Sequence, residues 1–191
     1  MRTQIKWAGR RFGPAVKALK SVTALLLCAA ATLTAQAGAD NRAPEVPEDI
    51  AVGETNKVHF HGFAIGVQIY TWNGNDWGPA VPRATLFDGN GVVATHFGTT
   101  NGPAWRSNSG SEVVGKLPPK VAKVDDDSIP WLLLEADSDR TQGPGIFANT
   151  SFIHRVNTVG GKAPAVAGTV IGQVAEVPYI ADYFFYRHTN N

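Results

Sequence analysis

Short segments in which apolar and polar residues alternate make up most of the chain after residue 56. Successive side chains of a β-strand point to opposite faces, so this period of two is typical of half-buried strands. No stretch shows the apolar stripe with a period of 3.6 residues that an amphipathic helix needs. The pattern predicts strands over residues 57–64, 66–72, 84–87, 92–97, 112–117, 129–136, 146–158 and 174–187. We therefore expect an all-β single domain over residues 57–191, either an antiparallel β-sandwich or a jelly-roll-like barrel.

The clearest hairpin turn is Asp88-Gly89-Asn90-Gly91, which separates two alternating segments. Glycine and asparagine supply the positive φ angles that two-residue hairpin turns require. Residues 89–94 also match the G-x-G-x-x-A pattern of dinucleotide-binding folds, in which the glycines open a helix that holds a pyrophosphate. Here Thr95-His96-Phe97 continues as a strand pattern, so we interpret the motif as a hairpin turn.

Residues 1–37 have the composition of a secretory signal peptide. They contain six basic residues and no acidic residue, followed by an apolar run from Val22 to Leu33 and then Ala35-Gln36-Ala37. A basic segment, a short apolar segment and an A-x-A site are the three parts of a cleavable export signal. The run is too short for a permanent membrane span. We expect export to the periplasm or the cell exterior, with cleavage after Ala37 or Ala39, and residues 38–56 as a leader segment.

Removal of the signal changes the charge of the chain. The whole sequence has 17 basic and 16 acidic residues; without the six basic residues of the signal, 11 remain against 16, a net charge of −5. This charge argues against a nucleic-acid partner or an anionic membrane surface, because both require a basic footprint. The single cysteine, Cys28, lies within the signal. The mature chain would then have no disulfide, thiolate nucleophile or cysteine-ligated metal.

The histidines suggest one candidate metal site. His59 and His61 are two residues apart on an expected strand, so their imidazoles would project from one face. Such a pair can hold copper or zinc when a third ligand arrives from elsewhere in the fold. His96 is the first candidate for that ligand and His154 the second. The alternative is that the pair occupies a solvated strand face and that the protein holds no metal or other cofactor.

Aromatic residues suggest a different kind of site. Trp77 and Trp105 lie in glycine- and asparagine-rich stretches, whereas Trp131 lies in an apolar segment that we expect to be part of the core. Tryptophans exposed in loops can line a pocket for a flat or apolar ligand, and the alternative is that their rings are buried in the core. The sequence contains no G-x-S-x-G nucleophile motif, so no serine-hydrolase signature points to an enzyme.

Eight segments occur in an order and spacing that resemble one protein family. They are Gly66–Tyr70, Trp77–Asp88, Thr95–Gly98, Gly102–Trp105, Gly110–Gly115, Ile129–Leu134, Arg155–Pro164 and Tyr179–Tyr186. Together they resemble the exported family of bacteria and fungi known as domain of unknown function 3455 (DUF3455), over about residues 46–187. The resemblance implies an exported, β-rich domain and supplies no activity, because the family is uncharacterised.

The resemblance also bears on particular residues. It places His96, Trp105, Arg155, Asn157 and Asp182 in the family's characteristic segments, and it leaves His59 and His61 outside them. Members of the family often carry two cysteines at places that Trp72 and Thr169 occupy here, so the resemblance implies that this chain lacks a cross-link and that Trp72 fills its volume.

These observations favour a non-enzymatic binding or cell-envelope protein. We expect its ligand, an unknown small molecule or envelope component, to bind in a pocket lined by Trp77, His96, Trp105, Arg155 and Asn157. The alternative is a small metal-binding protein or metal-dependent enzyme that uses His96 with His59 and His61.

Overall fold

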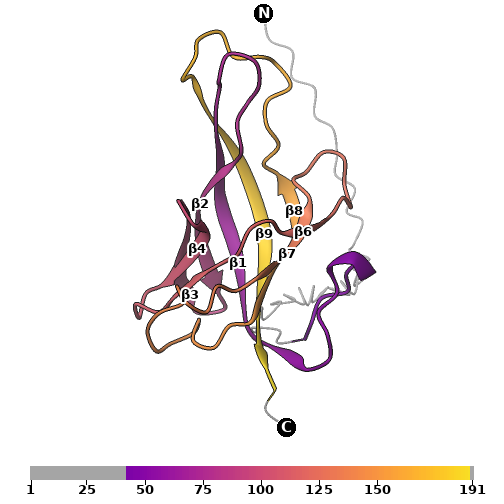
Figure 1. The fold of residues 1–191 in the computed structure, drawn as a ribbon, viewed down its shortest axis with the longest axis vertical. Coiled ribbons are helices and arrows are strands. Elements are labelled where there is room, and N and C mark those ends of the chain that lie inside the picture. The colour runs from indigo at the N-terminus through magenta and orange to yellow at the C-terminus, as the bar shows by residue number, and fades with distance from the viewer. Residues whose placement is uncertain (1–41, 190–191) are drawn as a thin grey trace, which may run out of the picture. The chain divides into compact units, whose positions relative to one another are not determined.

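Nine antiparallel strands form one sheet in the computed structural model, which describes residues 42–189. The strands are β1 (Asn56–Thr71), β2 (Val81–Asp88), β3 (Gly91–Thr99), β4 (Gly102–Ser107), β5 (Glu112–Val114), β6 (Lys120–Ala122), β7 (Trp131–Glu135), β8 (Phe152–Gly160) and β9 (Val174–His188). Their order in the sheet is β5-β4-β3-β2-β1-β9-β8-β7-β6. The long strands β1 and β9 run side by side through the centre, with β2–β4 on one side and β6–β8 on the other (Figure 1). The prediction of an all-β, antiparallel single domain is confirmed.

The sheet curls until its two ends meet. The backbone N–H of Lys116, just after β5, donates to the carbonyl oxygen of Glu135 in β7 at 2.8 Å. The N–H of Asp137 donates to the carbonyl oxygen of Val114 at the same distance. Backbone groups at the end of β5 thus pair with the end of β7, which leaves fewer unpaired groups at the sheet edge. The chain forms a single curled sheet where the sequence pattern also allowed two stacked sheets.

The backbones of β1 and β2 approach each other closely at Gly66. It pairs with Ala84 of β2 on one side and with Tyr179 of β9 on the other. A Cβ atom at Gly66 would lie 2.5 Å from the Cα of Ala84 and would also overlap the carbonyl oxygen of Arg83. Only glycine permits such a contact between backbones, and strand glycines often mark these approaches. The segments 57–64 and 66–72, expected as two strands, are therefore one strand that passes through Gly66.

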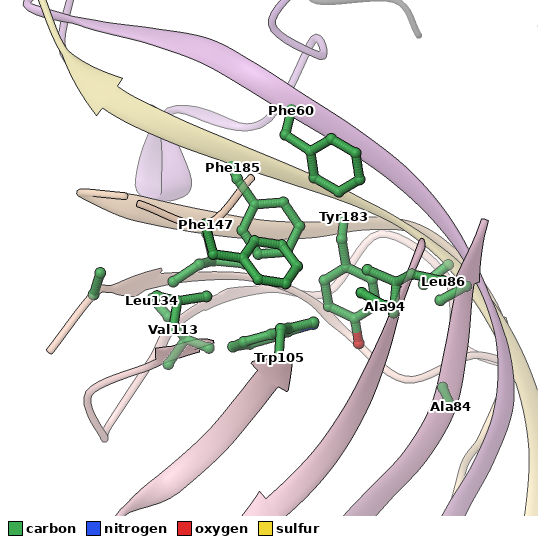
Figure 2. Packing of buried hydrophobic residues seen from close by; sticks show 14 of the residues in the cluster. Phe60, Ala84, Leu86, Ala94, Trp105, Val113, Leu134, Phe147, Tyr183 and Phe185 are labelled. Carbon is green, nitrogen blue, oxygen red and sulfur yellow. The ribbon is translucent and has the colours of Figure 1, made fainter. Parts of the chain in front are cut away.

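The inner face of the curled sheet holds the main hydrophobic core. Phe60, Phe147 and Phe185 form a ring cluster in which Phe147 and Phe185 lie 4.7 Å apart between centroids. Trp105 meets Phe185 edge-on at 5.8 Å, and Figure 2 shows these rings packed between the strands. Because each aromatic ring buries a large apolar area, this cluster supplies much of the stabilisation that a chain without disulfides requires.

The outer face is partly covered by the segment that precedes β1. This segment contains a short 3₁₀ turn, Glu48–Ile50, and the side chain of Ile50 is completely buried against Ala122 and Leu133. His154 ties the segment to the sheet, because its Nε2 lies 2.6 Å from the carbonyl oxygen of Ile50 and its Nδ1 lies 2.9 Å from the Tyr186 hydroxyl. Trp131, expected in the core, is half-buried and packs beneath this segment.

The observed strands match the expected segments in most places. The hairpin at Asp88–Gly91 is confirmed, since these two residues pair across β2 and β3. Strand β8 begins at Phe152, because residues 146–150 form a turn instead of the first half of a strand. Trp72 packs against Gly168, which precedes Thr169 in the chain. The expected signal peptide lies outside the described residues, and no helix within residues 42–189 has the length and hydropathy of a membrane span.

Candidate ligand-binding site

A pocket of about 760 Å³ lies inside the curled sheet. Strands β1–β4 and β7–β9 each contribute at least one side chain to its lining. Most of the wall is apolar and includes Pro79, Pro82, Leu132 and Leu134. Small-molecule sites have volumes of roughly 300–1,000 Å³ and combine apolar walls with a few polar groups, so this pocket fits the class.

His96 and Trp105 form a stacked pair at the inner end of the pocket. They are directly opposite each other on β3 and β4, which places both side chains on the inner face. Their rings are 4.2 Å apart and almost parallel, at 4°, and Tyr183 of β9 meets the His96 ring edge-on at 5.1 Å. His96 is 3% exposed and Trp105 is 1% exposed.

His96 is neutral in this position. Its Nδ1 lies 2.9 Å from the carbonyl oxygen of Ala104, which can only accept, so Nδ1 carries the proton and Nε2 is left as an acceptor. Burial lowers the pKa of His96 to about 3, the Ala104 carbonyl opposes this fall, and the charge of Arg155 adds to it. The imidazole therefore contributes no charge to the pocket at neutral pH.

Three buried side-chain donors of the described chain have no hydrogen-bond partner. They are Gln68 Nε2, Trp105 Nε1 and Arg155 Nε, and all three residues line the inner pocket. A buried donor without an acceptor costs about 1–3 kcal/mol, so native proteins rarely leave one unpaired. All three donors are enclosed side-chain atoms, and their residues line the same cavity.

Arg155 brings the positive charge of the pocket. Its Nη2 donates to the carbonyl oxygen of Pro130 at 2.8 Å, which holds the side chain toward the interior. Burial raises the pKa values of Tyr70, Tyr179 and Tyr183. The positive charge of Arg155 opposes this rise for each of the three tyrosines. Arg155 thus faces the same cavity as the aromatic cluster.

A larger depression, of about 1000 Å³, lies near the start of β1 and the end of β9. Its lining includes exposed charged side chains such as Lys57 and Arg187, which water already solvates. None of the three unpaired donors lies there. We therefore place the candidate site in the inner pocket.

Comparison with known proteins identifies a family for this chain. The model of the family described as "Protein of unknown function (DUF3455)" matches residues 27–187. The chain belongs to this family. No curated protein and no solved structure matches it. Membership in DUF3455 confirms the resemblance, and it adds no activity or ligand.

Of the five predicted ligand-binding residues, the structure brings three together in the pocket of this DUF3455 chain: His96, Trp105 and Arg155. Trp105 lies in strand β4, where a loop was expected. Trp77 lies outside the pocket lining, in the β1–β2 loop, where its Nε1 donates to the carbonyl oxygen of Val166 and its ring meets Trp72 edge-on. Asn157 is on the exposed outer face and donates to Asp182 at 3.0 Å.

The histidines expected to share a metal have different partners. A bulge at His59, between Val58 and Phe60, interrupts the alternation of β1. His59 Nε2 lies 3.3 Å from Thr150 Oγ1, whereas His61 stacks on Phe184 and its Nε2 lies 2.8 Å from Asp182 Oδ1. Within residues 42–189, no group of three or more His, Cys, Asp or Glu side chains is placed to hold a metal ion.

Gln68 and Tyr183 are two of the pocket residues that the sequence did not predict. Gln68 is 2% exposed, although its strand carries the apolar Val67 and Ile69 on the opposite face. The signal that could have found it is its place in the Gly66–Tyr70 segment, one of the segments on which the resemblance to the family was based. Tyr183 belongs to an aromatic face of β9 that the alternation shows, and that face is turned inward.

Proposed function

We propose that this chain is an exported, non-enzymatic binding protein that carries a small amphipathic molecule in the inner pocket. The observation that carries the proposal is that three residues with an unpaired buried donor, Gln68, Trp105 and Arg155, line the same cavity. The surrounding apolar wall would bury the rest of the ligand. Export follows from the basic, apolar and A-x-A parts of residues 1–37.

The polar groups of the pocket suit holding a ligand more than transforming it. They are hydrogen-bond donors at fixed positions and a neutral imidazole stacked on Trp105. Donors on strands of a hydrogen-bonded sheet are held rigidly, so little ordering entropy is lost when they meet an acceptor. A preformed site of this kind gives affinity without movement of the backbone.

A pocket-blocking substitution tests the proposal. Ala80 is exposed and lines the pocket, so the indole of Ala80→Trp should occupy its mouth. We expect the mature chain to bind at least one of decanoate, 1-decanol and decylamine with a single saturable isotherm in calorimetric titration. Ala80→Trp should weaken that binding at least tenfold, because the ligand and the indole compete for one space.

Ala167→Trp provides the matched control. Ala167 is exposed and lies outside the pocket lining, so the same added ring should leave binding unchanged. The proposal is wrong if none of the three probes binds saturably, or if both tryptophan variants bind like the unaltered chain.

A further inference from the structure

We infer that the pocket selects a monocarboxylic acid with an apolar body, the carboxylate lying against Arg155, Gln68 and Trp105. This inference rests on the proposed function, since it specifies the class of molecule that the same pocket binds. The charge of Arg155 specifies the head group of the ligand, and the apolar wall of the pocket specifies its tail.

The charge of the head group follows from Arg155. Among the lining residues that the structure describes, Arg155 is the only Lys or Arg, and none is Asp or Glu. No ion pair between residues of the 42–189 segment includes Arg155. Arg155 is half-buried, and a partly desolvated charge without a counter-charge is costly, so an anionic ligand would supply the missing partner.

The number of charges points to a carboxylate. With one cation in the lining and a neutral His96, a singly charged anion leaves the pocket balanced, whereas a phosphate dianion would bring an excess negative charge into an apolar cavity. The unpaired groups are all donors, on Gln68, Trp105 and Arg155. A carboxylate accepts only, and its two oxygens can take several hydrogen bonds at once.

The apolar body of the ligand is inferred from the other residues that line the pocket. Pro79, Val81 and Pro82 on one side and Leu117 and Leu132 on another present carbon to the cavity. Val81 and Leu117 are 46% and 61% exposed, so apolar surface at the pocket is left in contact with water. A hydrocarbon tail that covers it gains about 25 cal/mol per Å² of buried apolar surface.

The first test uses the unaltered mature chain and three probes of equal length. Decanoate, 1-decanol and decylamine share one tail and differ in the charge of the head group. We expect calorimetric titration to show decanoate binding about 10- to 100-fold tighter than 1-decanol, as charge-assisted hydrogen bonds imply, with decylamine weakest. Equal binding of decanoate and 1-decanol would overturn the inference and leave the proposed function standing. Binding of none of the probes would overturn both.

The second test removes the charge. Arg155→Met keeps a long apolar side chain and should bring the dissociation constant for decanoate to that for 1-decanol, while binding of 1-decanol stays within about threefold. Arg106→Met is the matched control, because Arg106 is adjacent to Trp105 on β4 but is exposed and paired with Glu112. The control should retain the preference for decanoate. An Arg155→Met protein that still prefers decanoate tenfold would contradict the assigned role of Arg155.

Discussion

Acidification from pH 7 to pH 4.5 is expected to lower the free energy of unfolding by about 2.5 kcal/mol through His96 alone. The pKa of His96 is about 3 in the folded chain, mainly because burial penalises the charged form, against an ordinary value of 6.5. Between these two values the unfolded chain binds a proton that the folded chain does not. The contribution is therefore complete above about pH 6.5 and is lost as the pH falls toward 3.

Two other histidines should also lower the free energy of unfolding in acid. Burial, together with the charge of Arg187, lowers the pKa of His59 to about 4. Burial also lowers the pKa of His154, whose bond to the Ile50 carbonyl opposes the fall. Each of these groups is neutral when folded and takes up a proton on unfolding in mild acid. The total loss of stability should therefore exceed the share of His96.

The substitution His96→Asn isolates the contribution of His96 to the loss of stability in acid. Asparagine can keep a donor to the Ala104 carbonyl, as His96 Nδ1 does, and it does not titrate. Urea unfolding followed by tryptophan fluorescence at pH 7 and pH 4.5 measures the loss in each protein. The variant should lose about 2.5 kcal/mol less than the unaltered chain on acidification. Equal losses in the two proteins would show that His96 is not held neutral by its surroundings.

Gly66→Ala is expected to destabilise the fold by at least about 3 kcal/mol, at the upper end of the range for overpacking. The new methyl group would meet backbone atoms of Arg83 and Ala84, which cannot rotate away as a flexible side chain can. Relief requires β1 and β2 to separate at a point where their ladder is continuous from Phe63 to Ile69. The loss of pairing would also disturb the inner face that carries Gln68.

Gly53→Ala is the matched control. An added methyl group at Gly53 has nothing within 4 Å, and the residue is exposed in the segment before β1. Its free energy of unfolding should change by no more than about 0.5 kcal/mol. Urea unfolding of the two variants beside the unaltered chain measures both effects. Similar stabilities for the two alanine variants would mean that the close approach at Gly66 does not constrain the sheet.

Local features of the sequence were sufficient for seven of the nine strands and for the hairpin at Asp88–Gly91, whereas β4 and β6 were not expected. A strand's alternation and a turn's glycine are properties of a few consecutive residues, so they can be recognised without the rest of the fold. The family resemblance likewise marked His96, Trp105 and Arg155, together with Asn157 outside the pocket, because the order of its segments can be recognised along the chain. Three of the five expected ligand-binding residues do meet in the pocket.

The sequence alone determined an all-β chain and most of its strands, and only the tertiary structure decided which face of each strand turns inward. Bulges at His59 and beside Asn157 shift the alternation by one residue. The spacing along the chain therefore did not predict which face of the sheet is occupied by His59 and His61, or by Arg155 and Asn157. Whether Gln68 or its neighbour Val67 faces the core depends on how β1 pairs with β2 and β9. The pocket depends further on closure of the sheet between Lys116 and Glu135, residues far apart in sequence. Such long-range pairing leaves no local pattern, because the residues that flank Lys116 or Glu135 in the sequence do not indicate its partner.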